Sequence, residues 1–551
     1  MRISHQIGPG TAPPDGRATR PPAPDAYGWR HRAVLIAPVL AALLGGLWGI
    51  RRGSMWQDEA TTYAVAGRAL PDLWRTLGNV DAVHGCYYLL LHPLIRLVGD
   101  AVPAEVVIRI PSVLATAVAA AGVAAVGRRL VSAPAGLYAG LAYAAAPVVV
   151  FHAQEGRPYA LVAAAVVEAT RLLATALCNP LCNPLCNPLC DPSRSTWVRY
   201  GVAVAVACLL NLFAVLALAA HAVTVLVAAA RGGGKGVAAR WARAVAGALL
   251  AVLPVAWTAF GQRGQVAWLE RPGLPEVKAL VTRFAGTGVL LAATVVLVVL
   301  GLAGSRTGGR AGGTAGGTAG TVARRAPGGC GELPGIAAFA VPLSLLPPAL
   351  LLAVSQIHPL YQDRYVLFSM VGLALALGAG LARAVRLLPA APGWPRAAAA
   401  LALPALLLGA SLPAQAAVRR IDSRPDDPAA VARVIGSGRR PGDAVLFLPS
   451  IRRLVAEAYP AAFRGVRDAA LRTGGAASGT LAGRELPAGE IAASLGAAPR
   501  VWVVSRPHPA PADLSSSRDS AKRLLLREGY SRERTVRVLG YAVRLYTRVS
   551  P

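Results

Sequence analysis

The run "AVLIAPVLAALLGGLWGI" (33–50) contains no charged residue and has about the length that crosses a bilayer, and "SMWQDEATTYAVAGRAL" (54–70) follows it closely. We expect this run to be a retained membrane span, because no small-residue cleavage site follows it. Two adjacent acids, Asp58 and Glu59, then stand within ten residues of its end. What such a pair can do depends on the face of the membrane on which it lies.

The bulk composition is that of a polytopic membrane protein. Of the 551 residues, 55% are hydrophobic and 15% are charged, and the mean hydropathy is +0.49. These values exceed what a water-soluble globular protein usually carries. The formal net charge of +29 comes almost entirely from arginine. The arginines stand between apolar stretches of about 20 residues, a pattern that excludes a soluble nucleic-acid-binding protein.

The hydrophobic pattern predicts a mainly α fold with about 11 transmembrane helices. A short re-entrant or interfacial helix is also expected at 86–98. Beyond 33–50, the expected spans are 110–127, 132–150, 158–177, 199–213, 214–230, 243–260, 286–304, 334–354, 365–385 and 397–414.

Three segments are expected to lack regular structure. Residues 1–30 are rich in Pro and Gly and predict a disordered cytoplasmic tail. The tandem repeat "LCNPLCNPLCNPLC" (177–190) has a proline in every unit, which forbids a regular helix, and its cysteine spacing matches none of the usual zinc sites. The Gly/Thr/Arg tract at 304–330 predicts a flexible linker.

The placement of arginine predicts the orientation in the cell membrane. If the N-terminus is cytoplasmic, the arginine-rich loops fall on the cytoplasmic side, as the positive-inside rule requires. The segments on the outer face are then 54–63, 151–159, 261–273 and 355–365. The acid pair therefore lies on the outer face, in a first outer loop that spans 51–108.

After a transmembrane domain at 31–414, the apolar runs of 415–551 shorten to strand length. "DAVLFLP" (443–449), "RVWVVS" (500–505) and "YAVRLYTR" (541–548) alternate with helix-like segments. This pattern predicts a C-terminal α/β domain, and an odd number of spans places it on the extracytoplasmic side. We interpret it as a packing or acceptor-docking domain without catalytic residues.

The acid pair admits two interpretations. Asp58 and Glu59 could be solvated loop acids, the usual fate of loop charge. The stretch "TTYAVAGRALPDLWRTL" (61–77) carries apolar residues near helical spacing, however, which predicts an amphipathic helix at the interface. Such a helix would hold the pair at the bilayer surface, where a partly desolvated carboxylate can accept a proton from an attacking hydroxyl.

Three arginines stand at the same level as the acid pair. Arg109 and Arg157 each open a span, and Arg364 lies in "YQDRYVLF". Taken singly, each is typical of a snorkelling interfacial anchor. Together on one face they indicate a clamp for an anionic lipid head group, since guanidinium binds phosphate bidentately and stays charged. Outer-face histidines, lone and at mixed spacings, are weak evidence for a metal.

Four stretches resemble, in order and sidedness, the landmarks of glycosyltransferase family 39 and its relatives. These enzymes have the GT-C fold and include protein O-mannosyltransferases and lipid A aminoarabinose transferases. The resemblance covers about 33–415 and implies inverting transfer of a sugar from a polyprenyl-phosphate donor to an acceptor hydroxyl on the outer face. The stretches are "WQDEATTYAVAGRAL", "HGCYYLLLHPLIRLVGDAVPAEVVIRIPSVLA", "AQEGRPYALVAA" and "HPLYQDRYVLFSM".

The resemblance also implies roles for particular residues. Asp58 matches the catalytic base, with Glu59 as its partner. Arg109 matches an arginine near the donor phosphate, and Arg157 and Arg364 would contact the same phosphate. The family usually has His-Pro-Pro before its paired aromatics, whereas here Gly and Cys follow the histidine. The residues expected to position substrate are His84, Tyr87, Gln154, Glu155, Tyr159 and Tyr365.

The sequence thus predicts a GT-C membrane glycosyltransferase, with mannose as the first sugar to consider. Its partners would be a polyprenyl-phosphate-linked donor, the lipid bilayer and a protein, lipid or cell-wall glycan acceptor, and nucleic acid is not among them. No residue is assigned to a metal, and dependence on a divalent metal stays open because relatives differ. A polytopic secondary transporter is the alternative, since it explains the spans equally well. An inactive lipid-binding relative would need no acid pair.

Overall fold

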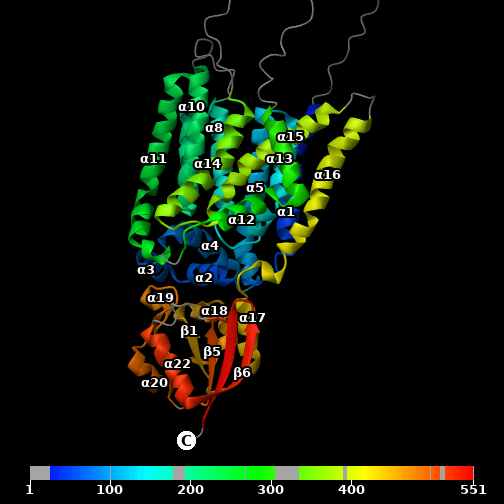
Figure 1. Cartoon of the computed structure of the whole chain (residues 1–551). Coiled ribbons are helices and arrows are strands. Elements are labelled where there is room, and N and C mark those ends of the chain that lie inside the picture. The colour runs from blue at the N-terminus through cyan, green and yellow to red at the C-terminus, as the bar shows by residue number, and fades with distance from the viewer. Residues whose placement is uncertain are drawn as a thin grey trace, which may run out of the picture.

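The computed structural model describes residues 25–99, 101–177, 193–266, 269–303, 334–388, 394–496, 498–508 and 516–549. Nearly all of the predicted N-terminal tail, nearly all of the cysteine-proline repeat and the glycine-rich linker at 304–330 lie outside these ranges. The described chain forms a bundle of long helices, with an α/β domain at one end of it (Figure 1).

Helices build the part of the chain that was predicted to lie in the membrane. Each of the eleven predicted spans is mainly helical, and 86–98 lies in a helix as well. The helices are α1 (Asp25–Leu47), α2 (Gln57–Ala66), α3 (Leu70–Asn79), α4 (Gly85–Val98), α5 (Ala104–Leu130), α6 (Ala133–Ala145), α7 (Pro147–Ala153), α8 (Tyr159–Leu177), α9 (Ser193–Leu210), α10 (Ala217–Ala228), α11 (Gly234–Gly261), α12 (Leu274–Ala285), α13 (Gly288–Ala303), α14 (Ile336–Ile357), α15 (Met370–Leu387) and α16 (Trp394–Ala417).

The number of spans is lower than predicted when length and hydropathy are both required. Within the described ranges, seven helices are long and apolar enough to cross a membrane, or up to nine if α6–α7 and α12–α13, bent by 61° and 74°, each count as one span. Helix α1 contributes only a shorter apolar segment, Arg32–Leu47. The figure of about 11 is therefore not confirmed, whereas a multi-pass membrane architecture is.

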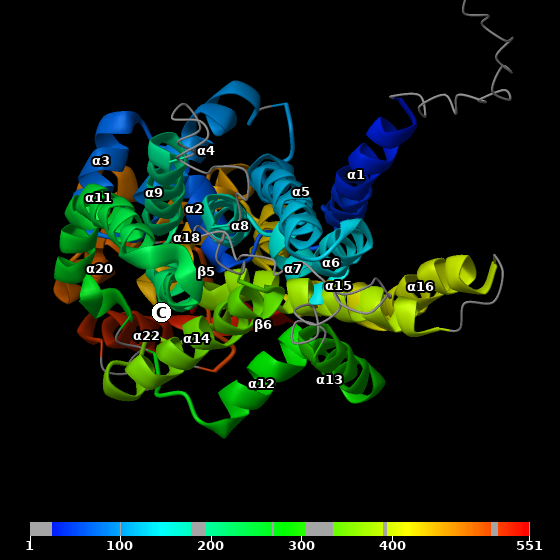
Figure 2. The same cartoon turned by 90° about the horizontal axis from the view of Figure 1, so that it is seen from above.

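Small residues hold the centre of the bundle together. Helix α15 packs against α6, α13 and α14, while α12, α13 and α16 lie at the periphery (Figure 2). An added Cβ at Gly380 of α15 would overlap the carbonyl oxygen of Leu297 on α13, and one at Gly378 would overlap the backbone of α6. Close approach of helix backbones is how helices associate where lipid supplies no hydrophobic driving force.

The segment after the acid pair is not one amphipathic helix. Helix α2 ends at Ala66, and α3 begins at Leu70 with Pro71 in its first turn. Arg68 lies between the two helices, and its buried side chain contacts the C-terminal domain. The prediction of a single helix over 61–77 was wrong, because apolar spacing does not reveal that this arginine is needed in the break.

The C-terminal domain is α/β, as predicted. Its sheet has the order β2-β1-β5-β7-β6, with β2, β1 and β5 parallel and β7 and β6 antiparallel to their neighbours. Alternate residues of β1 and β5 enter apolar clusters on opposite faces. The elements are α17 (Pro428–Gly438), β1 (Ala444–Leu448), α18 (Leu454–Ala458), β2 (Arg467–Asp468), β3 (Leu471–Thr473), α19 (Gly475–Ser478), β4 (Arg484–Glu485), α20 (Ala488–Leu495), β5 (Arg500–Ser505), α22 (Ser517–Gly529), β6 (Tyr530–Val538) and β7 (Tyr541–Arg548).

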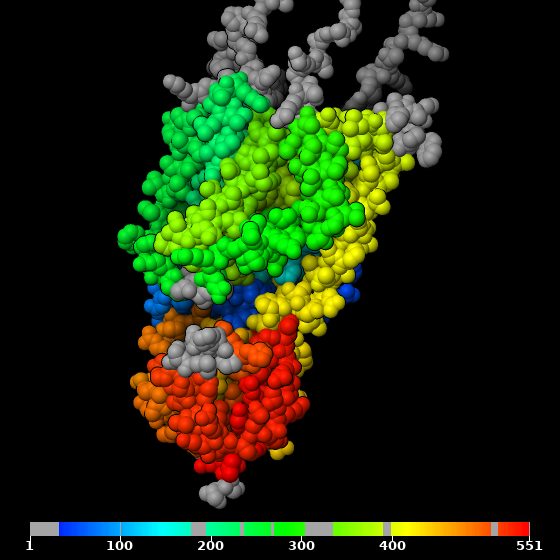
Figure 3. All heavy atoms as spheres, in the orientation of Figure 1, coloured from blue at the N-terminus to red at the C-terminus, as the bar shows by residue number. Residues whose placement is uncertain are grey.

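Arg68 joins the two parts of the molecule. Its guanidinium donates to the carbonyls of Thr480 and Leu481, at 2.8 and 2.9 Å, and to the Glu457 carboxylate at 3.0 Å. The four predicted outer segments lie at the same end of the bundle as this domain. Figure 3 shows a recess between the helices and the domain, with blue atoms of the N-terminal part of the chain at its floor.

Gly380→Ala should lower the thermal stability of the protein in detergent, because the new methyl group has no room beside Leu297. Overpacking of this kind costs about 1–3 kcal/mol. Gly409→Ala is the matched control, since no atom lies within 4 Å of the Cβ position at Gly409. Equal melting temperatures for the two variants would contradict the packing seen at α13 and α15.

Candidate active site

A buried ion pair between Glu59 and Arg109 lies among the loops that were predicted to be on the outer face. The Arg109 Nη2 donates to one Glu59 oxygen at 2.7 Å and Nε donates to the other at 2.8 Å. The other three N–H groups of Arg109 donate to the carbonyls of Ile50, Gly53 and Ser54 at 2.7–2.9 Å. All five donors of the guanidinium are therefore used inside the protein.

Glu59 also ties the first outer loop to the second. Its carboxylate accepts from the backbone N–H of Gly156 at 2.7 Å and from that of Trp56 at 3.3 Å. Nearby, the Ser112 hydroxyl of α5 contacts the carbonyl of Glu155 at 2.7 Å. The second loop thus takes its position from an acid in α2 and a serine in α5.

These contacts bear on two expectations. Glu59 is fully buried and paired with Arg109, and its role as the partner of Asp58 stays a prediction. All five N–H groups of Arg109 have partners within the protein, and its contact with a donor phosphate stays a prediction as well. The sequence could not show that the second acid of the pair points away from the first.

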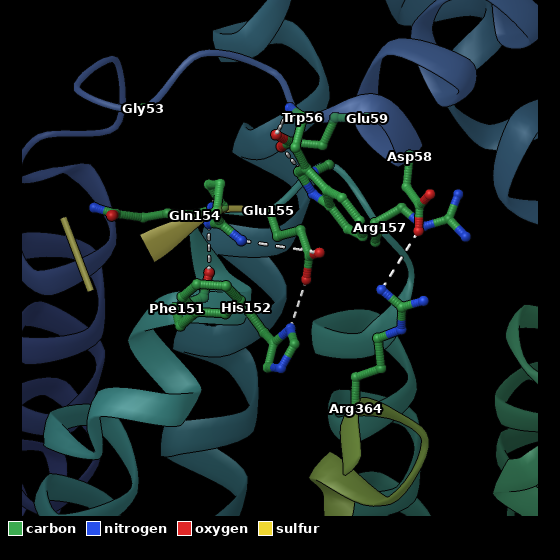
Figure 4. A network of polar contacts seen from close by, with 12 residues as sticks. Gly53, Trp56, Asp58, Glu59, Phe151, His152, Gln154, Glu155, Arg157 and Arg364 are labelled. Atoms are coloured by element: carbon green, nitrogen blue, oxygen red, sulfur yellow. Dashed lines mark hydrogen bonds and ion pairs between the residues drawn. The ribbon is translucent and has the colours of Figure 1, made fainter. Parts of the chain in front are cut away.

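Asp58 points the other way. It is half-buried in the first turn of α2, and its Oδ2 lies 3.4 Å from Nη1 of Arg364. Arg157 lies on the other side of the same carboxylate and donates to the Thr62 hydroxyl at 3.1 Å (Figure 4). The structure therefore brings together one acid and two arginines from three segments that lie far apart in the sequence.

Aromatic rings surround the Arg364 guanidinium. Its carbon lies 5.3 Å from the ring centre of Trp56, 5.7 Å from that of Tyr159 and 5.9 Å from that of Tyr365. Tyr365 in turn stacks on Phe213, with 4.5 Å between ring centres and 9° between planes. Such faces attract the cation and fix its direction.

Several buried polar atoms around Asp58 have no hydrogen-bond partner in the described part of the chain. They are Nε1 of Trp56, Nε of Arg157, the hydroxyl of Tyr159 and Nε of Arg364. Buried donors are normally satisfied, and leaving one unsatisfied costs about 1–3 kcal/mol. Their gathering beside one carboxylate is the arrangement expected where a ligand with several oxygen acceptors binds.

His84 contacts the Arg157 guanidinium. Its Nε2 lies 2.8 Å from Arg157 Nη2, and its Nδ1 lies 2.6 Å from a carboxylate oxygen of Asp81. The other Asp81 oxygen accepts from the Tyr88 hydroxyl. Burial by itself raises the pKa of Asp81, but His84 and Arg157 outweigh it and lower that pKa below the ordinary value.

Glu155 belongs to a neighbouring cluster. Its carboxylate lies 2.5 Å from Nδ1 of His152 and 3.9 Å from the Arg424 guanidinium. Burial raises the pKa of Glu155, and the opposing effect of His152, followed by that of Arg424, lowers it to about 2. Glu155 is therefore ionised and occupied by protein partners, which differs from the substrate-positioning role expected for it.

Two other residues expected to position substrate have packing contacts. The Gln154 amide donates to the carbonyls of Gly46 at 3.0 Å and Trp48 at 2.7 Å, and so caps the end of α1. Tyr87 is fully buried, and its hydroxyl reaches the Ile108 carbonyl at 3.5 Å. Of the predicted set, Tyr159, Tyr365 and, through Arg157, His84 lie around Asp58.

The segment that follows the last predicted span contacts the loop that carries Asp58. Asp426 accepts from the backbone N–H of Gln57 at 2.7 Å, and Asp427 accepts from the Ser54 hydroxyl at 2.6 Å. Gln57 is the first residue of α2, so a carboxylate sits at the positive end of the helix that carries Asp58. The C-terminal part of the chain, interpreted as a packing or acceptor-docking domain, thus contacts the loop that carries Asp58.

Sequence reasoning therefore missed Trp56, Asp81, Arg424 and Asp426. Trp56 and Asp81 stand two and three residues from predicted site residues, which was the available signal. For Arg424 and Asp426 no local signal existed, because their partners are hundreds of residues away along the chain. The described residues contain no group of three or more His, Cys, Asp or Glu that could hold a metal ion, and the charged groups nearest Asp58 are guanidinium groups, which do not form a ligand set.

No family model and no curated protein matches the sequence. Among solved structures, ArnT from Cupriavidus metallidurans in the apo state superimposes with a TM-score of 0.55 at 15% identity, covering 95% of this chain and 98% of that one. The same protein bound to undecaprenyl phosphate gives 0.54 at 14% identity, covering 94% and 98%. The archaeal oligosaccharyltransferase AglB from Archaeoglobus fulgidus gives only 0.45 at 12% identity, covering 95% and 74%, and supports no argument. The likeness to ArnT confirms the GT-C-like fold class.

Glu59→Gln and Arg109→Leu should each destabilise the protein strongly, because each leaves a buried charge without its partner. Removing one member of a buried pair costs about 3–5 kcal/mol. We expect low yield or a lowered melting temperature for both, and little change for Arg420→Ala, which breaks the exposed pair with Asp422. If the Arg109→Leu protein were stable and had lost only its affinity for the donor, the result would support a phosphate-binding role for Arg109.

Asp426 should make stability depend on pH. Burial raises its pKa to about 6, with the Gln57 N–H and Arg452 opposing and Asp58 adding to the rise. The folded state then holds the proton more tightly than the unfolded state, so wild-type stability falls as pH rises from 3.8 to about 6. Asp426→Asn should flatten this decline in thermal unfolding, and the exposed Asp422→Asn should not. Parallel curves for wild type and Asp426→Asn would refute the assignment.

Proposed function

We propose that this protein is a membrane glycosyltransferase that moves a sugar from a polyprenyl-phosphate donor to an acceptor hydroxyl on the outer face, with inversion. The observation that carries the proposal is the position of Asp58. It is a half-buried carboxylate with Arg364 3.4 Å away and Arg157 beside it, among buried donors that lack protein partners. An acid between two cations fits a reaction that removes a proton while negative charge develops on a phosphate.

The chemistry follows from these groups. The Asp58 carboxylate takes the proton of the acceptor hydroxyl, whose oxygen forms a bond to the anomeric carbon. The bond from that carbon to the phosphate oxygen breaks on the opposite face, and its electron pair leaves with the polyprenyl phosphate, which gains one negative charge. Arg157 and Arg364 stabilise this charge in a water-poor site, where fixed cations act most strongly. The proton on Asp58 then passes to solvent.

The fold comparison supports the lipid part of the donor. ArnT, which shares the fold over nearly its whole length, has been captured with undecaprenyl phosphate. A donor of the same class would place its phosphate at the boundary where Asp58 lies and its tail along the apolar helices. Mannose is the first sugar to test, and a protein, a lipid or a cell-wall glycan could supply the acceptor hydroxyl.

A secondary transporter remains the rival class. Its substrate site would lie among discontinuous helices near the bilayer midplane. Here the acid and the arginines come from α2, the loop after α7 and the 3-10 turn Asp363–Ser369, at the end of the bundle beside the C-terminal domain. This placement favours chemistry at one interface over passage through the bilayer.

Asp58→Asn should lower sugar transfer by about 100-fold or more, the range attributed to a general base. The assay is transfer of label from polyprenyl-phosphate mannose, and then from a panel of other polyprenyl-phosphate sugars, by purified protein in membranes. Asp72→Asn is the matched control, since Asp72 forms an exposed pair with Arg75 at 2.7 Å. Full activity in Asp58→Asn would remove the proposed base, and inactivity of wild type with every donor in the panel would favour the transporter.

A further inference from the structure

We propose that Asp81 and His84 form a positioning pair that holds Arg157 at the reaction site, and that this hold requires a neutral His84. The role given to Arg157 rests on the proposed function, whereas the contacts among Asp81, His84 and Arg157 do not depend on it. His84 then acts through Arg157 and does not contact the substrate. The role that the contacts give to Asp81 is to hold His84 in place.

The contacts determine the protonation state of His84. Arg157 Nη2 lies 2.8 Å from His84 Nε2, and a guanidinium has only donors to offer. Nε2 must therefore accept, so it carries no proton. The ring proton is on Nδ1, which donates to Asp81 at 2.6 Å. A hydrogen bond at one ring nitrogen thus fixes what the other can do, as in other histidine pairs.

Asp81 is held in place from several directions. Its backbone is in the left-handed region, with φ of 62°, which is uncommon for a residue other than glycine. The amide oxygens of Gln265 and Gln262, from the loop after α11, accept from the N–H groups of Asp81 at 3.2 Å and Ala82 at 2.9 Å. The Tyr88 hydroxyl donates to its carboxylate. An unusual backbone conformation that is supported this fully is typical of a functional position.

A proton added to His84 would disturb this arrangement. Nε2 would become a donor facing the Arg157 guanidinium, so one hydrogen bond would be lost and two cations would meet. The charged groups around the ring are Asp81, Arg157 and, beyond Arg157, Asp58, with Tyr88 at 6.0 Å between ring centres. Of its side-chain hydrogen bonds within the described chain, Arg157 would keep the one to Thr62 at 3.1 Å. The affinity for the donor should then fall.

The test compares His84→Gln with His84→Ala. A glutamine oxygen can accept from Arg157, so His84→Gln should keep a KM for the donor near the wild-type value. His84→Ala should raise that KM about tenfold, the effect of roughly 1.4 kcal/mol, and should lower kcat as well, because Arg157 also stabilises the charge that develops on the phosphate. His92→Gln, on the same helix and bound to the Ala66 carbonyl, should behave as wild type.

Two results would overturn the proposal. They are a His84→Gln variant as impaired as His84→Ala, and a loss confined to kcat, which would place His84 on the substrate. Nitrogen NMR of labelled histidines, assigned with His84→Gln, gives a readout without turnover and should show the neutral Nδ1–H form near pH 7.5. If wild type transfers no sugar, the proposed function fails, and the NMR result still decides the Asp81–His84–Arg157 geometry. A protonated or Nε2–H form would refute it.

Discussion

The ion pair between Glu59 and Arg109 is the constraint on which the candidate site and the loops around it depend. A charge buried this deeply is tolerated only when it is paired and its remaining hydrogen-bonding groups are satisfied. Arg109 meets this condition by donating hydrogen bonds to the carbonyls at the end of the first predicted span. Glu59 meets it by accepting a hydrogen bond from the N–H of Gly156. Two segments about a hundred residues apart are thereby held against each other. Asp58 is directed toward Arg157 and Arg364 because its neighbour is fixed.

The C-terminal domain completes the same structure from the other side. Asp426 and Asp427 bind the start of α2, Arg424 binds the carbonyls of Phe151 and Gln154, and Arg68 binds the domain in return. The domain is therefore joined to the acid loop by charged and backbone groups that face each other across the junction. The domain therefore helps to fix the position of the helix that carries Asp58.

Much of the fold followed from local sequence. Apolar runs of membrane length became helices, and strand-length runs after 415 became β1, β5 and β7, because backbone hydrogen bonding leaves few options for such segments. The span count was less secure, since the helices bend at Ala146, which precedes Pro147, and near Gly286, whose φ is 84°. Asp58, Arg157 and Arg364 were predicted to share one face because a carboxylate and arginines there form a recognisable pattern, and the structure places the three side chains together.

The sequence by itself determined a multi-pass helical protein with an α/β domain and a set of charged residues on one face. Only the tertiary structure decided which of those charges are available to a ligand. Asp58 and Glu59 are adjacent and chemically alike, yet successive residues of a helix point about 100° apart, so one faces Arg364 and the other faces Arg109. Arg109 and Arg157 both stand where a predicted span begins. All five N–H groups of Arg109 donate to carbonyls and to Glu59, whereas Nε of Arg157 has no hydrogen-bond partner in the described part of the chain. Partners that lie far along the chain make that difference, and no local pattern contains them.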